Sequence, residues 1–294
     1  TKGASGVAVM DAFARELVET GYLHNHARMW FAGFWIHVER LPWQLGADFF
    51  FRQLLDADPA SNTLSWRWVA GLQTSGKAYL PRRTNIERFL EPALLDTIGP
   101  AGLERLEPPR LSEAPLPRES PVPDAEPPAA PPFTLPARWG LWIHPDDASP
   151  ERKLLPPGTP PPSSLFVTES EPYPGISANR VNHLRVVVSD ATQRALEAWP
   201  HATLHLADSR APIGQQIADW MRRERLAALG TAKPFVGPHL QSLQQIEHLL
   251  AASSAPLCLF RRSWDTENLR FARTGFFPFW KARSAQLRSP TPAR

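Results

Sequence analysis

The first hundred residues carry apolar side chains at helical spacing. Between residues 7 and 19, apolar positions recur every three or four residues, and Thr20-Gly21 predicts the end of that helix. The same spacing predicts helices over residues 24–39, 45–55 and about 60–72, with breaks at Pro42 and Pro59. We therefore expect an all-α unit over residues 1–102.

The second half of the chain alternates short apolar runs with helical patterns. Runs of strand type occupy residues 139–143, 165–168, 184–188, 203–206 and 257–260. Helical patterns fall between them at residues 191–199, 213–229 and 240–252. Strands that alternate with helices indicate a parallel or mixed sheet with helical cover, so we expect a sandwich-like α/β domain over residues 137–285.

Two further segments lack the regularly spaced apolar residues that a packed core requires. Between Pro108 and Pro136, prolines recur every few residues among Ala, Glu and Ser, which favours extended polyproline II over a packed core. We expect a Pro-rich linker over residues 103–136 and a disordered tail over residues 286–294. The predicted fold class is therefore a multi-domain α and α/β protein.

Composition and charge narrow the possible function classes. The 294 residues are 43% hydrophobic, which suggests two domains, and the formal net charge of +3 is far from that of a dedicated nucleic-acid binder. The single cysteine, Cys258, excludes an intrachain disulfide and any multi-cysteine metal site. No apolar run approaches the ~20 residues that span a bilayer. We expect a cytoplasmic protein with no membrane partner.

Residues 21–68 combine polar and apolar groups within the helical unit. Amide, guanidinium, carboxylate and indole side chains, such as Asn25, Arg28, Asp56 and Trp66, lie among strongly apolar residues. Such polar groups are costly to bury unless they are paired. This composition is typical of a ligand pocket.

The order and spacing of six sequence blocks resemble a known family. The blocks are residues 6–17, 20–29, 43–46, 55–58, Asn62 and 66–68. Over residues about 6–90 they are similar to the FAD-binding domain of the DNA photolyase and cryptochrome family. The resemblance implies an all-α photolyase-like fold for the first unit and FAD as its cofactor.

The resemblance also implies a set of flavin-binding residues. Asn25 and Arg28 match flavin-pocket positions on one helix, and Asp56 matches the carboxylate that pairs with that arginine beside the flavin ring. Asp58 matches the residue at the polar edge of the flavin, and Asn62 matches the position facing flavin N5. In the family, helices upstream of these blocks contribute the diphosphate contacts, so residues 6–90 correspond to one wall of the pocket.

Further matched positions concern electron transfer and DNA. Trp66 and Trp43 match two members of the tryptophan relay that carries an electron to photoexcited flavin. Met29 and Trp68 fall where the family lines the opening for a flipped-out pyrimidine dimer. The aromatic residues Trp30 and Trp35 are interpreted as core.

Three functions follow as hypotheses. The first is a lyase of the deoxyribodipyrimidine photolyase type, which repairs pyrimidine-dimer DNA with light if the upstream part of the pocket is supplied. The second is a cryptochrome-like blue-light photoreceptor without repair activity, which signals to a partner through the α/β domain. The third is a remnant that no longer binds FAD.

No metal site is predicted. His24 and His26 stand two positions apart, so their side chains point to different sides of a helix. The sequence His144-Pro-Asp-Asp147 allows either a ligand cluster or a solvated turn, and the turn is the default interpretation.

Overall fold

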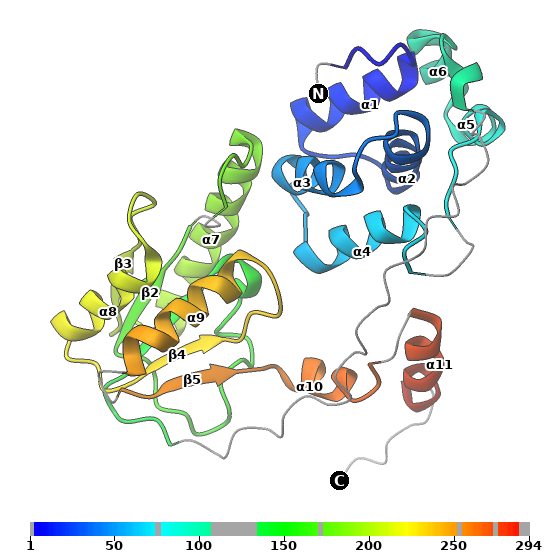
Figure 1. Ribbon diagram of the computed structural model, residues 1–294. Helices are drawn as coiled ribbons and strands as arrows, with labels where there is room; N and C mark the ends of the chain where they lie inside the picture. Colours follow the sequence, from blue (N-terminus) through cyan, green and yellow to red (C-terminus); the bar gives the residue numbers. More distant parts are fainter. Residues whose placement is uncertain are drawn as a thin grey trace. The chain divides into compact units, whose positions relative to one another are not determined.

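The computed structural model describes residues 3–73, 78–106, 134–169, 173–251, 255–272 and 276–287. The chain divides into two compact units (Figure 1). The first comprises Thr1–Pro117, Pro172–Val186 and Val236–Pro238, and the second comprises Arg118–Glu171, Val187–Phe235 and His239–Arg294. Most of the expected linker, residues 107–133, and most of the expected tail, residues 288–294, lie outside the described residues.

The first unit is helical, as the periodicity predicts. Its helices are α1 (Ala8–Thr20), α2 (Asn25–Gly33), α3 (Trp43–Gln53), α4 (Pro59–Val69), α5 (Arg83–Phe89) and α6 (Pro92–Ile98). A π-helical turn, η1 (Phe34–Val38), continues α2, and a 3-10 turn, η2 (Leu103–Leu106), follows α6. Large buried side chains, among them Met10, Leu17, Trp30, Phe50 and Trp66, form one core.

The helical unit extends beyond the expected start of the linker at residue 103. Leu103 and Leu106 are fully buried in the helical core. Their spacing of three residues places both side chains on the same side of the single turn η2, so a short segment contributes two core residues. The Pro-rich composition begins only after this turn.

A second difference concerns residues that follow the second strand of the sheet. The helical unit includes residues 173–186, which the sequence pattern predicts as part of the α/β domain. Arg180 is 1% exposed and donates to the backbone oxygens of Leu54 (2.7 Å) and Ala57 (3.0 Å). Its guanidinium also lies over the Phe51 ring, 4.7 Å from the centroid. Sequence periodicity carries no information on such long-range polar contacts.

The second unit contains one five-stranded sheet in which every pairing is parallel. Its strands are β1 (Gly140–Ile143), β2 (Ser164–Val167), β3 (Thr203–Leu206), β4 (Leu229–Ala232) and β5 (Leu257–Phe260), in the order β3-β2-β1-β4-β5. The helices are α7 (Ala178–Ala198), α8 (Ile213–Arg223), α9 (Pro238–Ala251), α10 (Ser263–Leu269) and α11 (Phe276–Leu287), with a 3-10 turn η3 (Pro145–Asp147) after β1.

Two apolar clusters pack on the two faces of the sheet. Leu141, Ile143 and Leu165 pack with side chains of α7, whereas Trp142 and Phe166 pack with side chains of α8 and α9. Successive strand residues point to opposite faces, which explains why Leu141 and Trp142 belong to different clusters. All residues of β1 and β2 are buried, and their side chains are apolar except for Ser164, because both faces of these strands are covered.

Two sequence predictions for this unit were wrong. Residues 184–188, expected as a strand, belong to α7, and β4 was not expected. In α7, Leu184, Val188 and Ala191 are buried at helical spacing while Val186 is 70% exposed, which is a pattern of period 3.6. A short apolar run alone does not distinguish a strand from part of a helix.

None of the helices in the described ranges is long and apolar enough to cross a membrane.

Candidate functional site

An ion pair joins the second helix to the loop between α3 and α4. Arg28 on α2 donates from Nη2 to both carboxylate oxygens of Asp56, each at 3.1 Å. Its Nε donates to the backbone oxygen of Leu23 at 2.7 Å. Both sides of the guanidinium are therefore oriented, one by a carboxylate and one by the main chain.

The exposure of this pair indicates that it contributes little to stability. The side chains of Arg28 and Asp56 are 24% and 61% exposed, and exposed ion pairs are worth only about 0–1 kcal/mol. The pair places a fixed positive charge at the edge of the helical core.

A backbone contact holds the two segments in register. The Leu55 amide donates to the backbone oxygen of Gly21 at 2.9 Å, which joins the turn before α2 to the loop that carries Asp56. Gly21 has a φ of +71°, and a Cβ there would lie 2.7 Å from the side chain of Leu55. Glycine meets both requirements, the left-handed backbone and the close approach.

Asp58 and Asn62 lie at the start of α4. Asp58 Oδ1 accepts a hydrogen bond from the Ser61 amide at 2.6 Å and so caps the helix, with Pro59 at its first position. Asn62 is half-buried and donates from Nδ2 to the backbone oxygen of Ala47 at 2.9 Å. This bond orients the amide, so its oxygen Oδ1 is the atom that can accept from a ligand.

Asn25 and Met29 complete the α2 part of the predicted set. Asn25 is the first residue of α2 and is exposed, and Met29 is half-buried one turn later. The Leu55–Gly21 hydrogen bond and the Arg28–Asp56 pair thus join α2 to the loop after α3, and this loop leads into α4.

The predicted relay residues have different surroundings. Trp66 is 2% exposed and packs edge-on against Phe50, with 5.0 Å between ring centroids, and against Trp35, at 6.3 Å. Trp43, the first residue of α3, is partly buried against the helical core. Trp35, which we had interpreted as core, is therefore the indole in ring contact with Trp66.

Trp68 lies on the same helix as Trp66 and remains accessible. It is 39% exposed and packs against the Tyr79 ring with 5.6 Å between centroids. An exposed indole supported by a second aromatic ring offers a face for stacking. Tyr79 lies outside the matched blocks, and its sequence context carried no signal for this role.

The helical unit is similar in sequence to a known domain. Residues 1–93 match the family described as the FAD binding domain of DNA photolyase. The deoxyribodipyrimidine photo-lyase of Agrobacterium fabrum is 44% identical over 71 residues, which cover 24% of this chain and 15% of that protein. The photo-lyase of Salmonella typhimurium is 38% identical over 78 residues, which cover 26% of this chain and 16% of that protein.

A cryptochrome is also among the relatives of this chain. Cryptochrome-1 of Arabidopsis thaliana is 40% identical over 70 residues, which cover 24% of this chain and 10% of that protein. The matched part of the chain thus spans no more than 16% of the length of these three relatives. No solved structure matches the chain with statistical significance. The similarity of residues 1–93 to the FAD binding domain of DNA photolyase indicates FAD as the cofactor of this domain.

Proposed function

We propose that this chain is a flavin-binding protein of the photolyase and cryptochrome type, which takes part in light-driven electron transfer from reduced FAD to pyrimidine-dimer DNA. The observation that supports this most directly is the geometry of Arg28. Its guanidinium is held from both sides, by Leu23 and Asp56, at the position where the family resemblance implies the flavin ring. A held positive group stabilises a negatively charged ring better than a mobile one, because its orientation is set before the ligand binds.

The remaining donor set also fits the polar edge of a flavin. Asn62 offers its Oδ1 as an acceptor for a ring N–H, while one of its two amide N–H groups donates to Ala47. Asp58 uses Oδ1 to cap α4, which leaves its second oxygen as the acceptor toward a ligand. Asn25, exposed at the start of α2, can both donate and accept. Bound FAD would supply the photochemistry, and these side chains would bind and orient it.

The aromatic residues extend the proposal to electron transfer and to DNA. Trp66 would act as the first indole of a relay, with Trp43 as the family-matched continuation and Trp35 as the alternative that the ring contact favours. Met29 and Trp68 would line the opening for the DNA lesion, where the exposed Trp68 ring can stack on a base.

The Arg28–Asp56 pair can be tested by flavin binding. The protein is incubated with FAD, separated from free flavin, and its bound flavin is measured by absorbance. We expect the wild type to retain FAD and Asp56→Ala to bind it about two- to fivefold more weakly, because Arg28 then loses the carboxylate that orients its guanidinium, an exposed pair worth up to about 1 kcal/mol. Glu87→Ala is the matched control, since it breaks the Arg83–Glu87 pair on α5, whose atoms lie 2.6 Å apart.

Two results would contradict the proposal. The wild type could bind no FAD, which would favour the remnant, or Glu87→Ala could lower binding as much as Asp56→Ala does. If FAD is retained, a repair assay on DNA that contains pyrimidine dimers distinguishes the two remaining functions. Dimer reversal under blue light supports a photolyase, whereas retained flavin without reversal supports a photoreceptor that signals through the α/β unit.

A further inference from the structure

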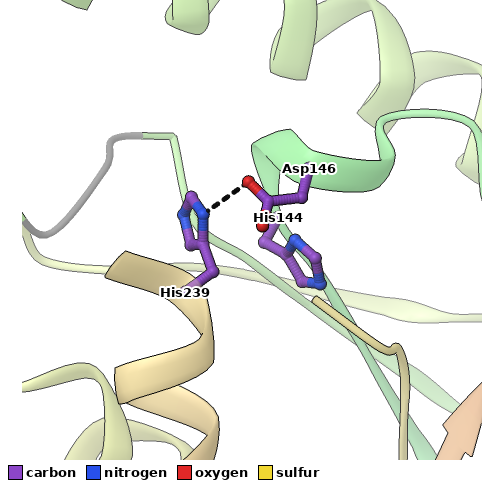
Figure 2. A group of neighbouring side chains, drawn as sticks. All are labelled: His144, Asp146 and His239. Carbon is purple, nitrogen blue, oxygen red and sulfur yellow. Dashed lines mark hydrogen bonds and ion pairs between the residues drawn. The ribbon is translucent and has the colours of Figure 1, made fainter. Parts of the chain in front are cut away.

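Three titratable side chains meet at the carboxyl edge of the sheet. His144 follows β1 directly, Asp146 lies in η3, and His239 is the second residue of α9 (Figure 2). β1 is the strand at which the order reverses, because β2 and β3 extend from one side of it and β4 and β5 from the other. In open parallel sheets, ligands bind beyond the carboxyl ends of the strands at this point.

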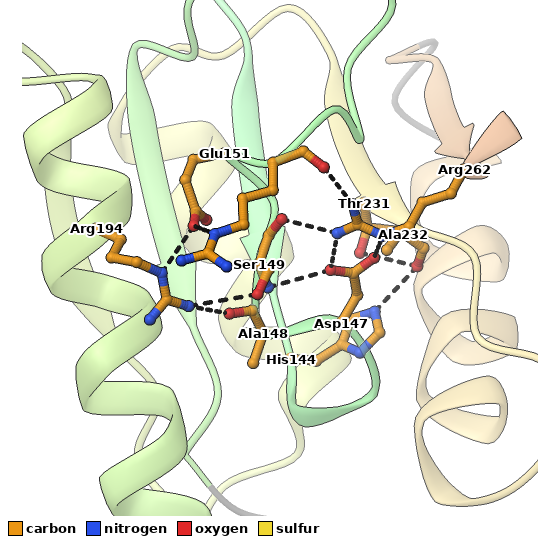
Figure 3. Close-up of polar contacts among 10 residues, drawn as sticks. His144, Asp147, Ala148, Ser149, Glu151, Arg194, Thr231, Ala232 and Arg262 are labelled. Atoms are coloured by element: carbon orange, nitrogen blue, oxygen red, sulfur yellow. Dashed lines mark hydrogen bonds and ion pairs between the residues drawn. The ribbon is translucent and has the colours of Figure 1, made fainter. Parts of the chain in front are cut away.

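His144 is buried, whereas the interpretation of residues 144–147 as a solvated turn holds for Asp146, which is exposed in η3. His144 is 1% exposed and its Nε2 lies 3.0 Å from the backbone oxygen of Ala232 (Figure 3). A carbonyl oxygen can only accept, so Nε2 carries the proton and Nδ1 keeps its lone pair. Burial is the main reason why the pKa of His144 is lowered to about 4, so the ring is neutral at pH 7.

His144 Nδ1 is a buried acceptor without a hydrogen-bond partner. On the other side of the cluster, His239 is fully buried, with its Nδ1 at 2.8 Å from Asp146 Oδ1. Figure 2 places the second ring nitrogen of His239 on the side away from Asp146, so Nδ1 is the ring atom that faces the cluster. One ligand atom from each of the three residues lies within 4.8 Å of the others.

The neighbouring carboxylate is engaged elsewhere. Asp147 accepts from Arg262 through both oxygens, at 2.6 and 3.0 Å, and Arg262 also donates to the backbone oxygen of Ser149 at 2.7 Å (Figure 3). This network neutralises Asp147 and holds η3 in place. Asp146, whose side chain is 29% exposed, gives the buried histidines an opening to solvent.

We propose that His144, Asp146 and His239 bind a divalent transition-metal ion of the zinc class. Two imidazoles and one carboxylate are a donor set that zinc sites use, and three protein ligands leave a coordination position for water. Bonds of about 2.0–2.2 Å join zinc to such ligands, so the three donors, now within 4.8 Å of one another, would move closer together around one ion.

Binding of the ion requires one proton to shift on the His239 ring. The ion replaces the proton between His239 Nδ1 and Asp146, and the His239 ring carries its proton on Nε2 instead. His144 coordinates through Nδ1 without losing a proton, and its bond to Ala232 acts as the supporting contact that orients a metal-bound histidine. The proposal concerns residues of the α/β unit and is independent of flavin binding.

Metal titration of the full chain tests this site. After treatment with a chelator, the protein is titrated with Zn²⁺ by calorimetry and with Co²⁺ by visible absorption. We expect one ion per chain and a tetrahedral cobalt spectrum. His144→Gln and His239→Gln should weaken binding by more than the ~10- to 100-fold that loss of a merely orienting group costs.

Two further variants separate ligation from structure. Asp146→Asn keeps an acceptor for His239 but removes the charge, so we expect weaker metal binding with unchanged circular dichroism. His205→Gln changes a partly buried histidine on β3 that pairs with Glu224 at 3.2 Å, and should bind as the wild type does. The proposal is wrong if the wild type binds neither ion, or if both cluster histidine variants bind as tightly as His205→Gln does.

Discussion

His37 illustrates how burial changes the chemistry of a single side chain. It lies in η1, and its Nε2 is 3.0 Å from the backbone oxygen of Val69, which ties the turn to the end of α4. Burial lowers the pKa of His37, the bond to Val69 opposes this, and the charge of Arg40 adds to the lowering. The net result is a pKa below the usual value of 6.5.

This shift predicts a pH dependence of the helical unit. Because the folded pKa lies below the unfolded pKa, the unfolded chain binds the proton more readily as the pH falls below 6.5. The stability contributed by neutral His37 is therefore present above pH 6.5 and is lost as the pH falls through the folded pKa. We expect His37→Gln, which keeps a donor for Val69 but does not titrate, to lose less stability on acidification.

Urea unfolding at a series of pH values measures this difference. His26→Gln, at an exposed position on α2, is the control and should follow the wild type. Equal loss of stability in the wild type and in His37→Gln would show that His37 does not contribute to the acid sensitivity.

At the scale of elements, α3 and α4 approach closely through one glycine. A Cβ at Gly46 would lie 2.2 Å from the six-membered ring of Trp66. Because Gly46 has no Cβ, the Trp66 ring packs directly on it and also contacts the Phe50 ring in the helical core. Helix propensity alone would favour alanine at this position by about 1 kcal/mol, so the packing requirement outweighs the local preference.

We expect Gly46→Ala to destabilise the protein by about 1–3 kcal/mol, the usual cost of overpacking a core. Chemical unfolding followed by tryptophan fluorescence measures the loss. In the double variant with Trp66→Phe, the smaller ring should relieve the clash, so the two effects should be less than additive. Gly214→Ala on α8 is a milder comparison, because its nearest neighbour is the flexible end of Leu249 at 3.3 Å. A neutral or stabilised Gly46→Ala would contradict the packing argument.

In β4, packing also outweighs the local preference of a glycine. Gly230 lies at the middle of this strand, and a Cβ there would meet the Trp139 ring at 2.6 Å and the Phe260 ring at 2.7 Å. Glycine and alanine are weak strand formers, so residues 229–232 carry no strand signal in the sequence, and the helical pattern was predicted to end at Leu229. Parallel pairing with β1 and β5 and burial of all four residues make this segment a strand.

At the scale of the whole molecule, the two proposed ligands belong to different units. FAD is proposed for the helical unit, at α2 and the start of α4, and the metal ion for the α/β unit, at the carboxyl edge of the sheet. A ligand that binds only the folded state slows the opening of the region that it contacts. The two ligands should therefore leave distinct patterns of protection.

Hydrogen–deuterium exchange checks this expectation. FAD should slow amide exchange around Arg28 and Asp56, and Zn²⁺ should slow it around residues 144–147 and at the start of α9. Each ligand should leave the other set of amides with its original rates. Protection by Zn²⁺ around Arg28, without protection of residues 144–147, would place the metal site elsewhere.

Local sequence by itself determined the helical unit and the residues proposed to bind the flavin. Arg28, Asp56 and Asn62 lie within 35 consecutive positions, counted from Arg28 to Asn62, so their order, helical spacing and family resemblance could be recognised along the chain. The Arg28–Asp56 pair was predicted and is present. Four of the five strand positions were also predicted from short apolar runs, although of these only β1 and β2 are buried throughout, and β3 is mostly exposed.

Only the tertiary structure decided which distant residues meet. Asp146 and His239 are 93 positions apart and become neighbours because β1 and β4 lie side by side in the sheet. The burial of His144, the contact of Trp35 with Trp66 and the packing of Arg180 on the loop after α3 depend in the same way on chain segments that are far apart in sequence. Periodicity shows which face of an element is buried, but the partner of that face is set by the topology of the folded chain.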